Sequence, residues 1–303
     1  MHLYIAASDD AARGLDDENK YKFCDDLTIL ELVALGGLLA EYDIKSPVAS
    51  DIGTQQKFLN PALIQTPSYI SDLETWTQDN KIRLNASKTN YMIFNRTRES
   101  FETRLAVEGQ WMERKKSLKL LGVWLDEDGG WSKNTQELCK RAYSRLSMLS
   151  KLRYAGVSME DLILIYKMHI RSCLEYCAVL FHSSLSSQQE AALERCQAVC
   201  LRVILAESYI SYDAALEMSG LTKLAERRNM RCKDFAKKCI KHQTNKRMFP
   251  LNVNESNTHE VRNREKYIVN FAHTSSYKNS TIPFCQRLLN STDGQDARTR
   301  SQG

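Results

Sequence analysis

Two adjacent aspartates, Asp25 and Asp26, lie between two short apolar runs in the segment YKFCDDLTILEL, residues 21–32. Adjacent carboxylates repel each other, and removing them from water is costly unless a cation or strong hydrogen bonds compensate. Because strand-forming residues flank the pair on both sides, we expect it at the turn of a β-hairpin. Carboxylates fixed at such a turn are hard oxygen ligands of the kind that Mg²⁺ prefers, and two metal ions can together catalyse phosphoryl transfer. Taken alone, an Asp-Asp pair is more often a solvated surface turn.

The composition is that of an ordinary soluble chain, with 43% hydrophobic and 26% charged residues among 303. No apolar run approaches the roughly 20 residues of a membrane span. The first ten residues also lack the basic and apolar regions of a signal peptide. The nine cysteines are scattered and odd in number, which predicts free thiols in a reducing compartment. We therefore expect an intracellular protein, nuclear or cytoplasmic and not secreted, with no membrane partner.

The net charge of +5 hides an asymmetry along the chain. Residues 133–241 carry 18 Lys and Arg against 11 Asp and Glu, whereas residues 1–35 carry 3 against 8. An acidic start and a basic body fit a metal-binding end joined to a surface that binds a polyanion. A solvated helical surface of mixed charge explains the same composition equally well.

The apolar pattern predicts an α+β chain that is mixed at the start and helical later. Residues 68–80 have helical spacing, whereas residues 81–95 are extended around a turn at Asn85–Lys88. Residues 117–125 are predicted to form one apolar strand. Three of the five prolines lie in residues 45–67, which predicts a long loop.

From residue 133 onward the apolar residues recur at helical spacing. The first helix has an apolar stripe made by Leu138, Ala142, Leu146, Leu149 and Leu152. The last long helix, residues 222–241, has a narrow basic face made by Lys223, Arg227, Arg231, Lys238 and Lys241. Contact with nucleic acid and contact with solvent explain that face equally well. Pairs of serine and acid at Ser158–Asp161 and Ser187–Glu190 have the spacing of helix-capping boxes.

Two other groups of residues are expected to pack in the core rather than to do chemistry. Cys173 and Cys177, and likewise Cys196 and Cys200, lie one helical turn apart in apolar helices without the spacing of a zinc site. The four tryptophans are expected to pack in the core or in hairpins rather than to stack on bases, and they are Trp76, Trp111, Trp124 and Trp131.

The order of these segments resembles the palm of non-LTR (LINE-type) retrotransposon reverse transcriptases, from the catalytic hairpin onward. Phe23-Cys24-Asp25-Asp26 resembles the aromatic-x-Asp-Asp signature, LNASKTNYMIF the Leu-Asn-x-x-Lys-Thr-x-x-Met segment, and LLGVWLD the primer-grip hairpin. Further on, IYKMHIRSCLEYCAVLF resembles the family's Tyr…Ile-Arg-Ser-x-Leu-Glu-Tyr helix, and ERCQAVCLRVIL, LAERRNMRCKDFAKKC and IPFCQRLLN continue the likeness. The resemblance covers roughly residues 20–290, and its specificity comes from the ordered series rather than from one motif.

The resemblance implies a domain plan. Residues 20–132 would be a truncated reverse-transcriptase palm that contains the inserted loop 45–67. A helical thumb and downstream helices would follow at residues 133–242, and residues 243–303 would form a largely irregular tail. Residues 1–19 would be non-homologous or disordered.

The resemblance also implies roles for individual residues. Asp25 and Asp26 would bind Mg²⁺ for RNA-directed DNA synthesis from deoxynucleotides, with Asp25 the more direct ligand. Lys88 would stabilise the pyrophosphate leaving group or donate a proton to it. Leu121 and Gly122 would form the turn that supports the primer terminus. The RNA template and DNA primer would be held through their phosphates by Lys140, Arg141, Arg145, Arg227, Arg231 and Lys238.

Several parts of the family's polymerase cannot be recognised in the sequence. These are the upstream aspartate on the neighbouring palm strand, the fingers with their Gly-x-Pro-Gln-Gly-type segment, and the endonuclease. Only residues 11–19 separate Asp10 from the hairpin, too few for the crossover that would place Asp9 or Asp10 on that strand. We therefore expect a C-terminal fragment of a reverse transcriptase that is inactive by itself. Two other interpretations stay open: a nucleic-acid-binding remnant that acts through its basic helices, and a pseudogene product with no function.

Overall fold

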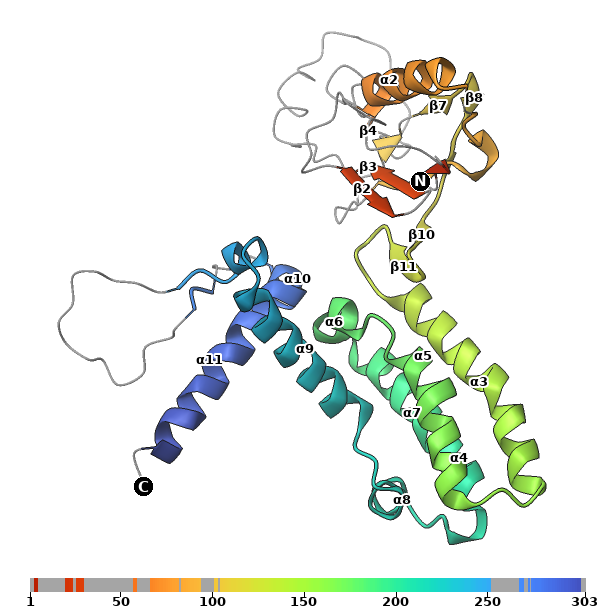
Figure 1. Ribbon diagram of the computed structural model, residues 1–303, viewed down its shortest axis with the longest axis vertical. Coiled ribbons are helices and arrows are strands. Elements are labelled where there is room, and N and C mark those ends of the chain that lie inside the picture. The colour runs from red at the N-terminus through yellow and green to blue at the C-terminus, as the bar shows by residue number, and fades with distance from the viewer. Residues whose placement is uncertain are drawn as a thin grey trace, which may run out of the picture. The chain divides into compact units, whose positions relative to one another are not determined.

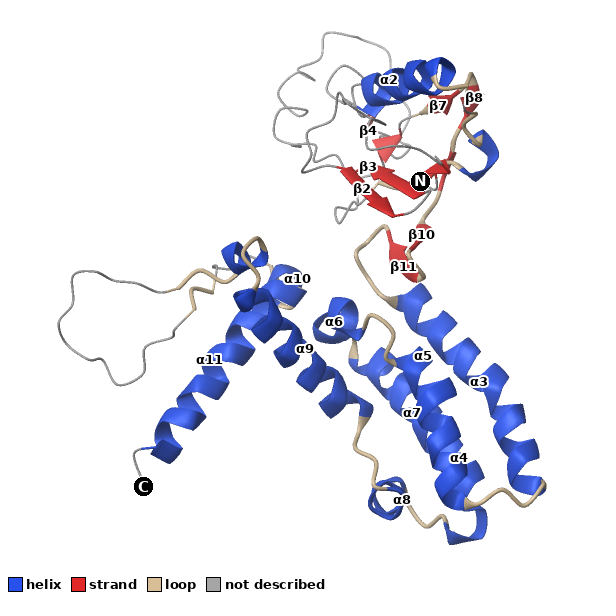
Figure 2. Ribbon diagram, viewed as in Figure 1, coloured by secondary structure: helices blue, strands red, loops and turns tan. Residues whose placement is uncertain are grey.

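The protein is described by a computed structural model. The described residues are 3–4, 20–23, 26–29, 57–58, 66–81, 83–93, 101–102, 104–251, 267–269, 272 and 274–300. The chain divides into two compact units, residues 1–129 and residues 130–303. Short strands and one longer helix make up the described part of the first unit, and helices make up that of the second (Figures 1 and 2). The chain is therefore a mixture of helix and strand, and its division lies close to the expected boundary at residue 132.

A three-stranded antiparallel sheet contains the predicted hairpin. Strand β2 (Lys20–Phe23) pairs with β3 (Asp26–Ile29) in a register that places Phe23 opposite Asp26. Strand β1 (Leu3–Tyr4) pairs with the other edge of β3, so that the order is β1-β3-β2. Two residues, 24 and 25, connect β2 to β3, which confirms the prediction of two strands joined at the aspartates. Asp25 lies outside the described residues, and so do Asp9 and Asp10.

Helix α2 (Thr66–Asp79) covers a small core in the first unit. Ile70 and Leu73 on α2 pack with Leu84 and with residues of the hairpin formed by β7 (Ala106–Val107) and β8 (Gln110–Trp111). The helix confirms the prediction made from the helical spacing after residue 67. Strand β4 (Lys57–Phe58), which pairs in parallel with β6 (Phe101–Glu102), lies inside the segment predicted to be a loop. That prediction is therefore wrong at residues 57–58, and also at residues 66–67, where α2 begins.

The apolar run at residues 117–125 is a hairpin and not the single strand that its apolar pattern predicts. Strands β10 (Ser117–Leu120) and β11 (Val123–Asp126) pair antiparallel, with Leu120 opposite Val123. Leu121 and Gly122 form the two-residue turn between them, with φ angles of +46° and +86°. Two successive positive φ angles are the geometry of a tight hairpin turn that matches the twist of the strands. The position of this turn agrees with the one that the primer-grip resemblance implied.

The second unit is helical throughout its longer described segments. Its elements are α3 (Ser132–Tyr154), α4 (Met159–Ile165), the π-helix η4 (Tyr166–Arg171), α5 (Ser172–Leu174), α6 (Ala178–Phe181), η5 (His182–Ser184), α7 (Ser187–Leu205), η6 (Ala206–Ser208), α8 (Tyr212–Ser219), α9 (Leu224–Lys241), η7 (Asn245–Met248), α10 (Ser275–Lys278) and α11 (Thr281–Arg300). Helix α3 packs along α7, and α4, η4 and α5 pack against α3 (Figure 1).

The apolar stripe predicted on the first long helix forms the main core. Leu138, Ala142 and Leu149 on α3 are buried, and the other two leucines of the stripe pack at the edge of the same core. Ser158 caps α4 as predicted, since its hydroxyl accepts from the backbone N–H of Asp161. The capping box of α7 lies one residue before the predicted one, at Ser186 and Gln189. The main core is therefore where the helical periodicity of the sequence places it.

The segment after residue 243 departs from the irregular tail that its composition predicts. Helix α11 packs against α9, and Cys285 and Leu289 of α11 are buried in one cluster with Cys232 and Cys239 of α9. The spacing of apolar residues in the first half of α11 gives it one buried face, which offsets the polar composition around it. The prediction is therefore wrong for residues 275–278 and 281–300. No helix in the described part of the chain is long and apolar enough to cross a membrane.

A buried hydrogen bond in the core of the second unit is expected to contribute measurably to the free energy of unfolding. The Tyr166 hydroxyl donates to Gln197 Oε1 at 2.6 Å, and both side chains are buried. Tyr166→Phe removes this donor and leaves a buried acceptor unpaired, so we expect a loss of about 1–3 kcal/mol in the free energy of unfolding, measured by urea denaturation. The control is Tyr154→Phe, because Tyr154 is 97% exposed and its change is expected to alter stability by less than about 0.5 kcal/mol. Equal stability of the two variants would contradict the role of this hydrogen bond.

Candidate nucleic-acid interface

The predicted carboxylate pair lies at the connection of the β2–β3 hairpin. Asp26 is the first residue of the central strand β3, with Phe23 opposite it on β2 and Tyr4 opposite it on β1. Because Asp26 is paired with a strand on each side, β1 and β2 together fix the position of its backbone. Among the described residues, no group of three or more His, Cys, Asp and Glu side chains is placed to hold a metal ion. The described residues therefore offer at most part of a metal-binding set.

The predicted catalytic lysine, Lys88, is exposed at the end of the short turn η3 (Ala86–Lys88). Asn85 caps this turn, because its side-chain oxygen accepts from the Ser87 hydroxyl at 2.7 Å and from the Lys88 N–H at 3.3 Å. Thr89 is buried, and its hydroxyl donates to the Asn85 carbonyl at 2.9 Å. The Asn-x-x-Lys-Thr spacing thus has a local physical reason. Asn85 and Thr89 hold the turn, and Lys88 lies on its exposed side.

The predicted primer-grip turn presents an apolar tip. Leu121 is 46% exposed although it is a large hydrophobic residue in a left-handed conformation. The base of the hairpin is held by a hydrogen bond of 2.7 Å from the Ser117 hydroxyl to Asp126 and by an ion pair of 3.3 Å between Arg114 and Glu127. The hairpin therefore has a base held by polar side-chain contacts and an exposed leucine at its turn.

The three basic residues predicted on α3 have different environments. Lys140 is exposed, and Arg141 is half-buried. Arg145 turns toward the neighbouring helix, where its guanidinium contacts the His169 carbonyl and the Cys173 thiol. Arg145 therefore ties α3 to the segment that follows η4, and Lys140 is the member of the set that faces solvent.

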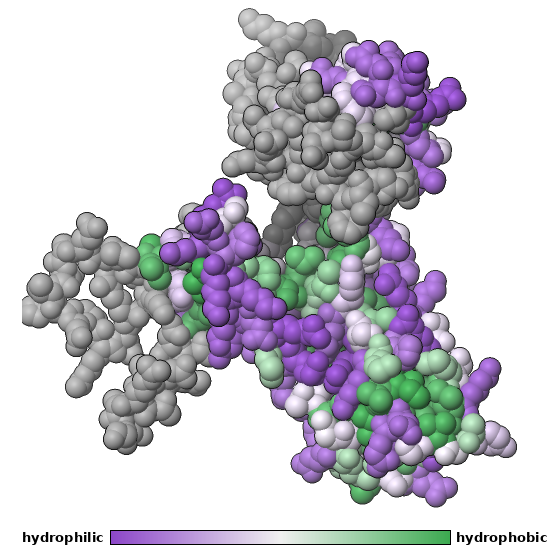
Figure 3. Space-filling model, in the orientation of Figure 1, coloured by the Kyte–Doolittle hydropathy of each residue, from purple (hydrophilic) through white to green (hydrophobic). Residues whose placement is uncertain are grey.

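The three basic residues predicted on α9 are also divided. Arg227 and Arg231 both pair with Glu175: Arg227 Nε and Nη2 lie 2.5 and 3.2 Å from its two carboxylate oxygens, and Arg231 Nη2 lies 2.9 Å from Oε2. Glu175 is buried, at 4% exposure. Lys238 is exposed in the last turn of α9. Figure 3 shows hydrophilic side chains gathered over this helix. The basic face predicted from the helical wheel is thus partly a set of ion pairs.

Arg227 and Arg231 pair with the Glu175 carboxylate, and the Glu175 charge also acts on Arg171. We call these three arginines the arginine cluster. The pKa of Arg171 is lowered, first by burial and then by the charge of Arg227, and Glu175 opposes this shift. The pKa of Arg227 is raised, chiefly by its hydrogen bond to Glu175. The cluster brings together basic residues of η4 and α9 around the acidic side chain that follows α5.

The segment 171–177 is also where the two predicted sets approach each other. Arg145 of α3 contacts this segment at Cys173, while Arg227 and Arg231 of α9 contact it at Glu175. The Arg141 charge acts on the pKa of Tyr176: the neighbouring Cys177 raises that pKa, and Arg141 opposes the rise. The structure therefore brings Arg145, Arg227 and Arg231 into contact with one short segment.

Three charged residues of this region were not found from the sequence. Glu175 and Arg171 belong to the quoted Arg-Ser-x-Leu-Glu-Tyr motif, but nothing in the sequence names their partners. Arg228 is fully buried, donates to His182 Nδ1 at 3.4 Å and pairs with Glu190 at 3.5 Å. Its position four residues after Leu224 and four before Cys232 is a signal that could have identified it, because it places a cation on the apolar stripe of α9.

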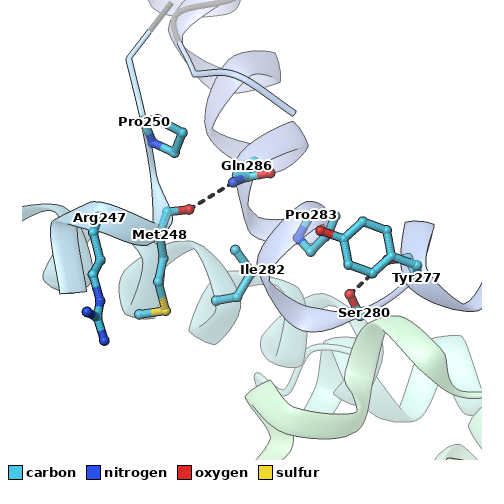
Figure 4. Close-up of a pocket in the computed structure, with 8 residues that line it drawn as sticks. All are labelled: Arg247, Met248, Pro250, Tyr277, Ser280, Ile282, Pro283 and Gln286. Carbon is cyan, nitrogen blue, oxygen red and sulfur yellow. Dashed lines mark hydrogen bonds between the residues drawn. The ribbon is translucent and has the colours of Figure 1, made fainter. Parts of the chain in front are cut away.

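The candidate site is separate from the cavity drawn in Figure 4. That cavity has a volume of about 330 Å³ and lies beside η7, α10 and α11. Met248, Ile282 and Pro283 give it apolar walls, and Gln286 donates to the Met248 carbonyl at 2.8 Å. None of the residues that the sequence selects for chemistry lines it.

Comparison of the chain with protein-family models, with curated proteins and with solved structures finds no match. These comparisons therefore assign the chain to no family. Its function has to be argued from the hairpins, the capped lysine turn and the arginine cluster.

The environment of His182 predicts that stability depends on pH. Burial, followed by the nearby charge of Arg228, lowers the pKa of His182 to about 4. The unfolded chain takes up a proton near pH 6.5 and the folded chain does not, so stability is complete above pH 6.5 and falls between pH 6.5 and 4. Because His182 is only partly buried, we expect a loss of about 1–2 kcal/mol over this range.

The measurement is the urea-unfolding free energy of the wild type and of His182→Asn at several pH values. Asparagine keeps an acceptor near the position of Nδ1 but does not titrate, so the variant is expected to lose less stability between pH 6.5 and 4. Parallel curves for the two proteins would show that His182 is not the group responsible.

Proposed function

We propose that this chain carries the catalytic hairpin and the helical thumb region of a reverse transcriptase of the non-LTR retrotransposon type. We further propose that by itself it binds a template–primer duplex without extending the primer. The observation that best supports this is the register of the β2–β3 hairpin, which leaves Asp25 at the connection and Asp26 at the start of the central strand. Lys88 on a capped turn and the turn at Leu121–Gly122 follow in the order that the family resemblance implies.

In the complete polymerase, each of these parts has a role in nucleotidyl transfer. Asp25 and Asp26 would hold Mg²⁺, which when bound activates the attacking oxygen and stabilises the leaving oxygen. Lys88 would place a positive charge or a proton beside the departing pyrophosphate. Leu121 and Gly122 would support the primer terminus. Basic side chains of α3 and α9 would bind phosphates without regard to sequence.

The sequence offers Asp25 and Asp26 for this chemistry, but the upstream aspartate that would complete the carboxylate set is not recognisable in it. Two adjacent carboxylates bind Mg²⁺ weakly when a third ligand is missing, since the cation then keeps most of its water. We therefore infer that the isolated chain does not polymerise.

A nucleic-acid-binding protein without catalytic function is the second candidate. The arginine cluster favours it, because the cluster and the exposed Lys140 and Lys238 lie in the unit of residues 130–303 and need no carboxylate site. Both candidates predict binding of nucleic acid. They differ in the role of Asp25 and Asp26, which take part in nucleotidyl transfer only under the first proposal.

The test of binding uses the purified chain and a fluorescently labelled RNA–DNA template–primer duplex. We expect Kd to rise steeply with salt, because phosphate contacts release counterions. Lys140→Ala and Lys238→Ala are each expected to weaken binding about two- to fivefold, as is typical for one exposed phosphate contact. Lys151→Ala, at another exposed position on α3, is the matched control and is expected to leave Kd unchanged. Asp25→Asn should also leave Kd within about twofold, since it removes no phosphate contact.

The test of activity adds deoxynucleotides and Mg²⁺ to the same complexes. We expect no primer extension by the wild type. Extension that Asp25→Asn abolishes would overturn the proposed inactivity, whereas absence of binding at low salt would overturn the proposed function as a whole.

A further inference from the structure

The arginine cluster holds more positive charge than its own acid can neutralise. Arg227 and Arg231 pair with the single Glu175 carboxylate, and Arg171 adds a third positive charge one helical turn before it, where its carbonyl accepts from the Glu175 N–H at 3.0 Å. One acid against three arginines leaves an excess of two positive charges. Burial lowers the pKa of Arg171 most, and the charges of Arg227 and then Arg231 lower it further, while Glu175 opposes the shift. One further anion would relieve this excess.

Glu175 fixes the direction of two of these guanidinium groups. Both carboxylate oxygens are used, one by Arg227 Nε and the other by Arg227 Nη2 and Arg231 Nη2. The Glu175 side chain is 2% exposed, whereas those of Arg227 and Arg231 are 27% and 51% exposed. The acid is therefore buried, whereas the two arginine side chains that pair with it are partly exposed to solvent.

The backbone on both sides of Glu175 has an uncommon conformation. Arg171 ends the π-helix η4, and Cys177, two residues after Glu175, has a left-handed φ of +51°. A π-helix is rare in any protein, and a left-handed φ is uncommon for a residue other than glycine; both features concentrate at functional sites. Arg227 and Arg231 are four residues apart on α9, so their side chains lie one above the other on one face of that helix.

We propose that Glu175 is a positioning residue that holds Arg227 and Arg231, together with Arg171, as a clamp for one backbone phosphate of the bound nucleic acid. The proposal rests on the proposed function, because it assigns the ligand of the same basic surface. Guanidinium groups bind phosphate oxygens through pairs of N–H groups, and their geometry matters as much as their charge. Holding two flexible arginines before binding reduces the ordering cost that the phosphate would otherwise have to offset.

The clamp makes a prediction opposite in sign to that of charge alone. Glu175→Gln removes a negative charge from a site that binds an anion, so simple electrostatics predicts tighter binding. If Glu175 positions the arginines, the same change releases them, and binding weakens although the net charge has risen. The sign of the change therefore separates a positioning role from a charge effect.

The experiment compares duplex binding by the wild type, Glu175→Gln and Glu226→Gln. Glu226 is an exposed acid next to Arg227 on α9, so its change removes the same charge without touching the clamp. At about 0.1 M salt we expect Glu175→Gln to weaken binding about five- to tenfold and Glu226→Gln to leave it equal or slightly tighter. Tighter binding by both variants would overturn the clamp.

A second variant tests the clamp by changing a partly exposed side chain instead of the buried glutamate, so that the fold is expected to be preserved. Arg231→Lys keeps the charge of a half-exposed side chain but loses the planar fork, and we expect it to weaken binding about threefold or more. Unchanged binding by Arg231→Lys would overturn the clamp even if Glu175→Gln failed to fold, which circular dichroism would reveal. If the wild type itself does not bind the duplex, the proposed function fails. If it binds and the variants behave as charge alone predicts, only the clamp fails.

Discussion

The buried carboxylate of Glu175 is the constraint on which the arrangement of the second unit depends. A carboxylate removed from water is destabilising unless cations replace its hydration, and losing one partner of such a pair costs about 3–5 kcal/mol. Here the cations come from α9, 52 and 56 residues further along the chain. Helix α9 must therefore lie where Arg227 and Arg231 reach Glu175, which fixes its rotation as well as its position. The same rotation buries Arg228 and Cys232 and turns Lys238 outward.

Local periodicity predicted the elements whose apolar residues face one side. The strands beside the aspartates, helix α2 and the buried stripe of α3 all follow from spacing alone. The β10–β11 hairpin did not, because apolar residues run through its turn without the Asn-Gly pair that marks a tight hairpin. Leu121 adopts a left-handed conformation that is costly for a leucine, so only the family resemblance pointed to a turn there.

The contacts of the candidate site could be predicted only in part from the sequence. A helical wheel correctly placed Arg227 and Arg231 on one face, but it could not reveal that a glutamate on a distant segment meets them. Cys177 was expected in the core and is instead exposed, because the chain turns through a left-handed residue there. Trp111, expected to pack, is 71% exposed at the end of a two-stranded hairpin too short to cover it. In each case the deciding fact is a tertiary contact or a positive φ angle, and neither leaves a periodic signal.

The residues proposed for chemistry and those proposed for binding lie in different units of the chain. The residues suited to nucleotidyl transfer belong to residues 1–129, and the basic residues suited to hold phosphates belong to residues 130–303. The core of the second unit is built from its own helices, and Glu175 and its arginines lie entirely within that unit. A change that disables the aspartates therefore leaves the arginine cluster intact. Under the proposed function, such a chain would therefore keep its affinity for nucleic acid after losing its catalytic chemistry, and the two proposals would describe the same protein with and without a complete active site.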